Sequence, residues 1–224
     1  MQLCVQEIKK RFRRKEVLRD VSFTAESGRA VALLGSNGSG KSTLLRILAG
    51  VLRPDGGTCL WEGQDLLRDD RRRAGTVAYV PQGTPLLEEL SARDNLRLWY
   101  EPEALERSLE EGILNRLGVK DFLKTPAGKL SGGMKKRLSI GCAMAHDPRV
   151  LLLDEPTAAL DLRGKEEILS CFDGFCRAGG LLLMATHDPM ELELCDSWLL
   201  LEDGRVQPYA YDGDVHALAG RLRA

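Results

Sequence analysis

The sequence lacks any long hydrophobic run. No apolar segment in its 224 residues approaches the roughly 18 residues that a membrane-spanning helix needs, and the longest are strand-like pieces such as 181–185. The first residues, MQLCVQEIKKRF, contain no apolar core of a secretory signal. We therefore expect a cytoplasmic protein, and any role at the cytoplasmic face of a membrane would have to come through a partner.

A cysteine framework is also absent. The six cysteines are scattered along the chain without a CxxC pair. This spacing fits neither a zinc site nor the disulfide pattern of a small secreted protein. We expect buried, reduced thiols.

An excess of charge of either sign is missing too. The formal net charge is −1, which argues against non-specific electrostatic binding of nucleic acid. We therefore expect no nucleic-acid partner. One local basic run spans residues 9–15. The run is predicted to be a solvated hairpin turn, with contact to phosphate as the alternative.

Strand-like and helix-like segments alternate over much of the chain, which predicts a parallel sheet with crossover helices. The fold class is therefore α/β, with a mainly parallel core sheet and an N-terminal antiparallel β subdomain. A helical subdomain is inserted at about residues 83–145, and one domain spans residues 1–224. The expected strands are 3–8, 17–25, 30–35, one within 55–66, 75–80, 149–156, 180–188 and 197–206; the expected helices outside the insert are 41–53, 164–176 and 189–195.

A glycine-rich stretch, GSNGSGKS, follows the short apolar strand at 30–35 and precedes an amphipathic helix. It matches G-x-x-x-x-G-K-[ST], the phosphate-binding loop of P-loop NTPases. Glycines let successive backbone N–H groups turn inward, and the helix N-terminus adds free N–H groups and a positive dipole end. The predicted cradle consists of Gly35, Ser36, Asn37, Gly38, Ser39, Gly40, Lys41, Ser42 and Thr43, with Lys41 reaching the β- and γ-phosphates and Ser42 placing its hydroxyl on Mg²⁺.

An acidic pair ends the apolar run VLLLDEP. A carboxylate at the carboxyl end of a core strand lies near the phosphate loop in a doubly wound sheet. Asp154 can therefore hold Mg²⁺ through water, and Glu155 can polarise an attacking water. The alternative is a surface acidic pair after a strand.

A second anion-binding helix start is predicted at KLSGGMKKR. Ser131 is a good N-cap, and Gly132 and Gly133 leave backbone N–H groups open before a helix that begins at about Met134. Alone, the pattern indicates only a capped helix. In a chain with one lysine-bearing cradle, it suggests that one chain offers this second site to the nucleotide held by another.

These motifs resemble those of the ATP-binding cassette (ABC) ATPases, the engines of ABC transporters. The resemblance covers essentially the whole chain, and the motifs occur in the family's order. GSNGSGKST matches the Walker A motif, Gln82 in VPQG the Q-loop, and LSGGM the signature. LLLDEP then matches Walker B, AALD at 158–161 the D-loop, and His187 in ATHD the switch histidine.

The resemblance implies roles by position. Two chains would pair head to tail around two ATP molecules, each between one Walker A motif and the partner's signature. Phe12 takes the place of the aromatic ring that stacks on adenine. Gln82 would touch Mg²⁺ and the attacking water, His187 would contact the γ-phosphate, and Asp161 would bridge the two chains.

The leading interpretation is the ATPase subunit of a transporter with a separate transmembrane permease. The permease would dock on the helical insert, for which Leu86, Leu87, Leu98 and Trp99 are candidates. Met134, where many importer cassettes have Gln, and the motif SGGMKKR favour an exporter. The alternatives are a soluble ABC ATPase that acts on ribosomes or DNA, and a nucleotide-binding regulator without turnover, against which the intact Glu155 and His187 argue.

Overall fold

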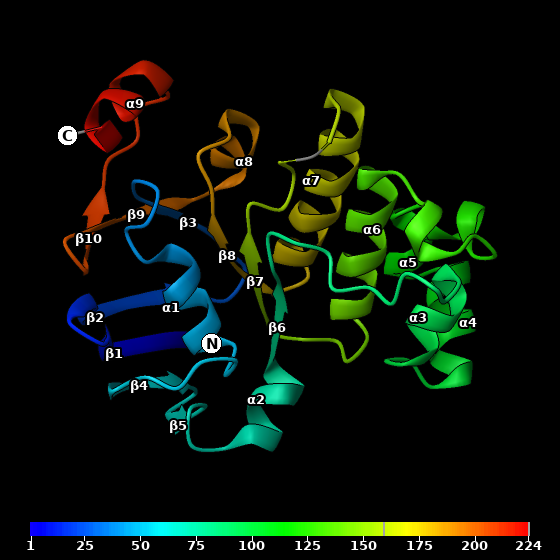
Figure 1. The fold of residues 1–224 in the computed structure, drawn as a ribbon, viewed down its shortest axis with the longest axis horizontal. Helices are drawn as coiled ribbons and strands as arrows, with labels where there is room; N and C mark the ends of the chain where they lie inside the picture. Colours follow the sequence, from blue (N-terminus) through cyan, green and yellow to red (C-terminus); the bar gives the residue numbers. More distant parts are fainter. Residues whose placement is uncertain (159, 224) are drawn as a thin grey trace.

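A computed structural model describes residues 1–158 and 160–223 (Figure 1). Ala159, which belongs to the expected D-loop, lies outside the described residues. Two sheets, one antiparallel and one mainly parallel, build the core with helices around them. The fold confirms the predicted α/β class with an N-terminal antiparallel β subdomain.

The antiparallel sheet has the strand order β2-β1-β4-β5. Its first two strands are longer than predicted, because the hairpin pairing continues to Phe12 and Lys15. Only Arg13 and Arg14 of the basic run form the turn. Backbone hydrogen bonds extend the ladder through polar residues that carry no apolar pattern. The strands are β1 (Gln2–Phe12), β2 (Lys15–Glu26), β4 (Gly56–Trp61) and β5 (Gln64–Asp65).

The main sheet has the strand order β10-β9-β3-β8-β7-β6, and only β10 is antiparallel to its neighbour. Three central strands are buried along their whole length, as expected where helices or a second sheet cover both faces. The strands are β3 (Ala30–Leu34), β6 (Val77–Val80), β7 (Val150–Asp154), β8 (Leu181–Ala185), β9 (Ser197–Glu202) and β10 (Arg205–Tyr209).

The two faces of the main sheet pack into two apolar clusters. One cluster joins the main sheet to α1 and the antiparallel sheet, and the other joins it to α7, α8, α9 and the helical insert. The helices outside the insert are α1 (Lys41–Leu48), α2 (Asp70–Thr76), α7 (Leu162–Arg177), α8 (Pro189–Leu194) and α9 (Val215–Arg223).

Three of these helices differ from the prediction. Helix α2 was not predicted, and it takes in residues 75 and 76 of the strand expected at 75–80. Helix α1 ends at Leu48, five residues early, because Gly50 takes a left-handed conformation with φ +76° and reverses the chain. Helix α9 was not predicted. Its Leu218 is 2% exposed in the main core, and Asp214 caps it by accepting hydrogen bonds from the N–H groups of His216 and Ala217. No helix among the described residues is long and apolar enough to cross a membrane.

The helical insert lies between β6 and β7, at the right of Figure 1. Its last helix begins at Gly132, two residues before the predicted start, and Ser131 caps it as expected by accepting the Met134 N–H at 3.2 Å. The elements of the insert are α3 (Ala92–Arg97), α4 (Pro102–Glu110), α5 (Ile113–Arg116), the 3₁₀ turns η1 (Val119–Phe122) and η2 (Ala127–Lys129), and α6 (Gly132–Ala143).

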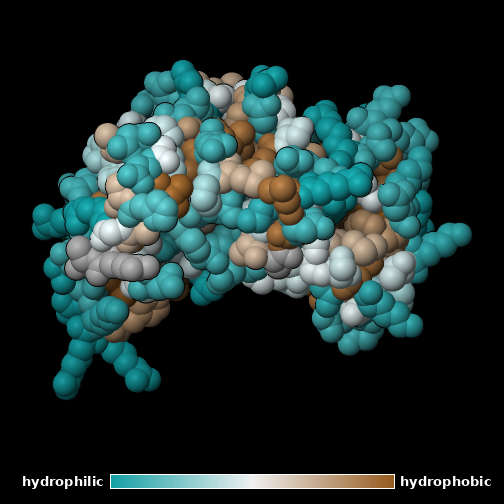
Figure 2. Space-filling view, turned by 90° about the horizontal axis from the view of Figure 1, so that it is seen from above, coloured by the Kyte–Doolittle hydropathy of each residue, from teal (hydrophilic) through white to brown (hydrophobic). Residues whose placement is uncertain are grey.

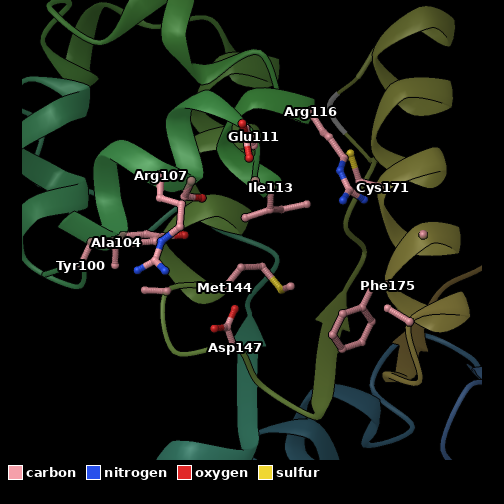
Figure 3. Close-up of a pocket in the computed structure, with 15 residues that line it drawn as sticks. Tyr100, Ala104, Arg107, Glu111, Ile113, Arg116, Met144, Asp147, Cys171 and Phe175 are labelled. Atoms are coloured by element: carbon pink, nitrogen blue, oxygen red, sulfur yellow. The ribbon is translucent and has the colours of Figure 1, made fainter. Parts of the chain in front are cut away.

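A groove of about 600 Å³ separates part of the insert from α7 (Figure 3). Arg107 and Ile113 line it from the insert, Met144 lines it just beyond α6, and Phe175 faces them from α7. The insert is therefore not packed tightly against the core along this side.

Five of the six cysteines are buried, and Cys4 is partly exposed. No disulfide joins them in the described parts of the chain. Burial raises the pKa of Cys59 and of Cys142 to about 12, so these thiols stay protonated at neutral pH. The structure confirms the expected burial for five of the six thiols.

Candidate nucleotide-binding site

Four neighbouring parallel strands bring the predicted motifs to one edge of the sheet. In the order β3-β8-β7-β6, the segments that follow the strands carry the glycine loop, His187, the acidic pair and Gln82. Parallel strands present their carboxyl ends on one side, where open α/β sheets bind ligands. Topology thus gathers residues that lie more than 150 positions apart in the sequence.

The backbone of the glycine loop needs its glycines. Gly40 has φ +112°, and a Cβ there would lie 3.0 Å from Cγ1 of Val17. At Gly35 a Cβ would lie 2.6 Å from the carbonyl oxygen of Leu201. The loop is therefore pressed against β2 and β9 and turns its backbone toward the start of α1.

The side chain of Lys41 bends back over this loop. Its Nζ donates to the carbonyl oxygens of Gly35 at 2.6 Å and Ser36 at 3.1 Å, and the residue is 9% exposed. Burial lowers the pKa of Lys41, and the nearby carboxylates of Glu155 and Asp154 oppose that effect. A buried ammonium whose hydrogen-bond partners are two neutral carbonyls is well suited to a phosphate anion.

One cavity of about 580 Å³ joins most of the predicted site residues. The glycine loop and the first turn of α1 form one wall. Phe12, Gln82, the acidic pair and His187 also line the cavity, together with Val17, which sequence reasoning missed. The lining residues are Phe12, Val17, Asn37, Gly38, Gly40, Lys41, Ser42, Thr43, Gln82, Asp154, Glu155 and His187.

Glu155 is the centre of the polar contacts in this cavity. Gln82 donates from Nε2 to its Oε2 at 2.7 Å, and Nδ1 of His187 lies 3.7 Å from its Oε1. Glu155 itself has φ +46°, a conformation that costs energy for a non-glycine residue and is found at functional sites. The turn aims the carboxylate into the cavity rather than along the strand.

The donor set fits magnesium. The Asp154 carboxylate is 4% exposed and accepts a long 3.4 Å hydrogen bond from the Tyr79 hydroxyl, while Ser42 lines the same cavity. Among the described residues, no three His, Cys, Asp or Glu side chains form a metal cage. Magnesium that is bound by one carboxylate, a hydroxyl, waters and phosphate oxygens needs no such cage.

Several predicted residues lie outside this cavity. Gly35 and Ser36 line a second hollow of about 490 Å³ beneath α9, and Ser39 lines a third behind the loop. The signature residues Ser131 and Gly132 are exposed at the start of α6, and neither they nor Gly133 lines the cavity. Asp161 is exposed and caps α7, because its Oδ1 accepts the Gly164 N–H at 2.8 Å.

Sequence reasoning also missed two buried polar residues near the site. Lys136 on α6 and Glu191 on α8 are 3% and 1% exposed. The signal for Lys136 was its position four residues before Ile140, which puts it on the buried face of a helix. No local pattern identified Glu191.

The glycine loop, its lysine and the acidic strand end define a nucleoside-triphosphate site of the P-loop class. Comparison with known families refines this class. The ABC transporter family model matches residues 18–158. The chain belongs to the ABC transporter family, as an ATP-binding subunit and an ATPase.

Curated relatives agree with this assignment. The lantibiotic transport ATP-binding protein SrtF of Streptococcus pyogenes is 32% identical, over 94% of this chain and 92% of the relative. The Nod factor export ATP-binding protein I of Sinorhizobium fredii is 36% identical over 94% and 62%. The molybdenum import ATP-binding protein ModC of Rhizobium etli is 38% identical over 84% and 55%.

Solved structures share the fold. An ATP-binding subunit of an ABC transporter superposes with a TM-score of 0.87 at 27% identity, and the match covers 100% of both chains. The cassette MJ0796, solved as a dimer in a post-hydrolysis state with ADP and Pi, gives a TM-score of 0.82 at 25% identity over 92% of this chain and 97% of that one.

Proposed function

We propose that this chain hydrolyses ATP as a head-to-tail dimer with a second copy of itself and thereby drives transport through a separate transmembrane permease. The supporting observation is the placement of the signature. Helices α1 and α6 both begin on the upper side of the molecule in Figure 1, yet residues 131–133 do not line the cavity that starts at α1. A second chain, turned around, would bring its signature over that cavity.

The glycine loop would bind the triphosphate of ATP. Its backbone N–H groups and the first turn of α1 point donors at phosphate oxygens, and Lys41 would exchange its two carbonyl partners for the β- and γ-phosphates. Phe12, 45% exposed at the cavity wall, would stack on adenine. Mg²⁺, held by Ser42, Gln82 and Asp154 through water, would neutralise phosphate charge.

Hydrolysis would depend on Glu155. Its carboxylate would orient and polarise the attacking water, and Gln82 already fixes one carboxylate oxygen at 2.7 Å. His187 would donate to the γ-phosphate, on which negative charge accumulates. Asp161 of each chain would bridge to the partner, and its cap on α7 gives it a fixed position.

The helical insert would receive the membrane partner. Leu87, Leu98 and Trp99 are each more than half exposed, whereas Leu86 is partly buried in the core and contributes less. These exposed large apolar side chains on the insert would connect the permease to the catalytic site. This contact would hold the subunit at the cytoplasmic face.

Export is the proposed direction. The motif SGGMKKR supports it, and the relative named for Nod factor export matches 94% of this chain, against 84% for the relative named for molybdenum import. The relatives described above are transport proteins by name, so the alternative of a ribosome- or DNA-directed ATPase gains no support from them.

Glu155→Gln tests the proposal. The variant keeps the shape of the side chain and loses its charge, so it should bind Mg-ATP and form a stable dimer while turnover falls at least about 100-fold. Size-exclusion chromatography with and without ATP, together with phosphate release, measures both effects. A variant that turns over at near wild-type rate would show that Glu155 is not the base, and one that stays monomeric with ATP would contradict the dimer.

A further inference from the structure

Lys136 is a buried cation without an acidic partner in the part of the chain described here. It lies on α6, five residues after the capping Ser131, and is 3% exposed. Burial lowers its pKa, against the attraction of the Asp154, Glu191 and Glu155 carboxylates. No carboxylate among the described residues lies within 4.0 Å of its Nζ.

The two hydrogen-bond partners of Lys136 belong to the Q-loop. Its Nζ donates to the carbonyl oxygens of Pro81 and Gln82, both at 3.1 Å. The side chain of Gln82 in turn donates to Glu155 at 2.7 Å. A continuous path of polar contacts therefore runs from the signature helix to the proposed base of the same chain.

Folding alone does not require a lysine at this position. Burying an ammonium costs free energy that two neutral carbonyls repay only in part, so an apolar side chain of similar length often serves stability as well. Both carbonyls belong to residues that are at least partly exposed, so water can replace the lysine there. The cost of the charge points to a role in positioning.

The neighbouring Lys135 makes a different contact. Its Nζ donates to the exposed Glu88 at 2.8 Å, on the surface of the insert. Along α6, Arg137 pairs with Glu167 of α7 at 2.5 Å, while the groove in Figure 3 leaves the far part of the insert loosely packed. Among the described side chains of α6, Lys136 and Arg137 are the ones that make polar contacts outside the insert.

We propose that Lys136 couples the two nucleotide sites of the dimer. Lys136 joins α6 to the backbone of Gln82. The start of α6 would contact the partner's nucleotide, while the side chain of Gln82 holds Glu155 in this chain's own site. When the signature closes on one nucleotide, α6 carries Lys136 with it, and the carbonyls of Pro81 and Gln82 follow. Closure at one site then sets the geometry of Gln82 and Glu155 at the other. The inference rests on the dimer proposed above.

The test compares Lys136→Met, Lys136→Arg and the control Lys135→Met in the full-length protein with Mg-ATP. Phosphate release gives kcat, KM and the Hill coefficient, and thermal melting reports the fold. Each substitution is also made together with Glu155→Gln to measure ATP-dependent dimerisation by size-exclusion chromatography.

Lys136→Met should keep its melting temperature and its dimerisation but lose about tenfold in kcat, with KM little changed. Its Hill coefficient should fall to 1 from a wild-type value above 1. Lys136→Arg should restore most of kcat and of the cooperativity, and Lys135→Met should match the wild type.

Three outcomes would overturn the inference. Unchanged kcat and Hill coefficient in Lys136→Met, with dimerisation intact in the Glu155→Gln background, would reject the coupling and leave the proposed function standing. Loss of kcat that follows a matching loss of melting temperature would show a structural role instead. If Glu155→Gln alone fails to dimerise with ATP, the proposed function falls and the coupling falls with it.

Discussion

At the scale of single residues, Glu191 lies outside the cavity and connects two of the segments that line it. Its Oε1 accepts the Thr157 N–H at 2.9 Å and also the Thr157 hydroxyl, whereas its Oε2 has no hydrogen-bond partner among the described residues. Thr157 follows the acidic pair, and Glu191 lies on the helix after His187. The contact therefore joins the segment after the acidic pair to the helix after His187.

Burial raises the pKa of Glu191 above 4.5, which makes a prediction about stability. A carboxyl group with a raised pKa in the folded state binds its proton more tightly when folded, so stability falls as pH rises above about 4.5. Glu191→Gln has no such proton and can still accept from Thr157. The stability of the variant relative to the wild type should increase with pH by at most about 1.4 kcal/mol per pH unit.

Melting temperatures between pH 4.5 and pH 7.5 measure this difference. Glu193→Gln, on the exposed side of the same helix, is the control for the loss of a carboxylate from this helix. A constant difference between Glu191→Gln and the wild type would mean that the buried carboxyl does not titrate in this range.

The residues of the candidate site were predictable from sequence to different degrees. Gly40, Lys41, Asp154 and Glu155 stand in contiguous motifs whose chemistry is local, so the pattern alone located them. Lys136 was not singled out, because its role depends on which face of α6 meets a loop that lies 54 residues earlier in the chain. A linear pattern cannot identify a contact of that kind.

At the scale of secondary structure, two serines cap helices in the same way. Comparing their substitution by alanine distinguishes the contribution of Ser131 to helix stability from its proposed contribution to nucleotide binding. Ser131 caps α6 through the Met134 N–H at 3.2 Å, and Ser91 caps α3 through the Asp94 N–H at 3.1 Å. Replacing either serine with alanine should cost about 1 kcal/mol of stability. Only Ser131 belongs to the proposed second wall of the ATP site.

We therefore expect Ser131→Ala and Ser91→Ala to melt at similar temperatures, both below the wild type. Turnover at saturating ATP should fall about tenfold in Ser131→Ala alone, because it loses a hydrogen bond to a charged phosphate. Phosphate release and thermal melting provide the two measurements. Equal turnover in both variants would remove Ser131 from the site.

Elements were predicted well where one local pattern decided them. The central strands of the main sheet and the start of α1 follow directly from apolar runs and the glycine loop. The end of α1 was wrong because the apolar spacing of Val51 and Leu52 continued past Gly50. In the structure, Val51 is 68% exposed beyond the helix, since the left-handed turn at Gly50 overrides the spacing.

At the scale of the whole molecule, exposed apolar side chains are few and separate. In Figure 2 apolar patches interrupt a mostly hydrophilic surface without forming a continuous band. Leu98 and Trp99 are adjacent in sequence at the end of α3, at 58% and 53% exposure. A partner that covers them would bury apolar area that the isolated chain leaves in water.

Leu98→Asn with Trp99→Gln should therefore abolish co-purification with the proposed transmembrane permease. The isolated variant should keep its melting temperature and its basal ATPase, because neither side chain is buried. Leu162→Asn removes an apolar side chain that is 67% exposed at the start of α7 and is the control. Undiminished co-purification in the double variant would place the docking surface elsewhere.

The spacing of the parallel strands also sets the distances between the residues of the candidate site. Consecutive strands end at or just before Gln82, the acidic pair, His187 and the glycine loop. Backbone hydrogen bonds keep neighbouring strands about 4.8 Å apart. The lateral span of the candidate site, about 14 Å across three intervals, is thus set by the peptide backbone and not by any side chain. Chemistry at one position can therefore change in evolution while the distances to the others stay the same.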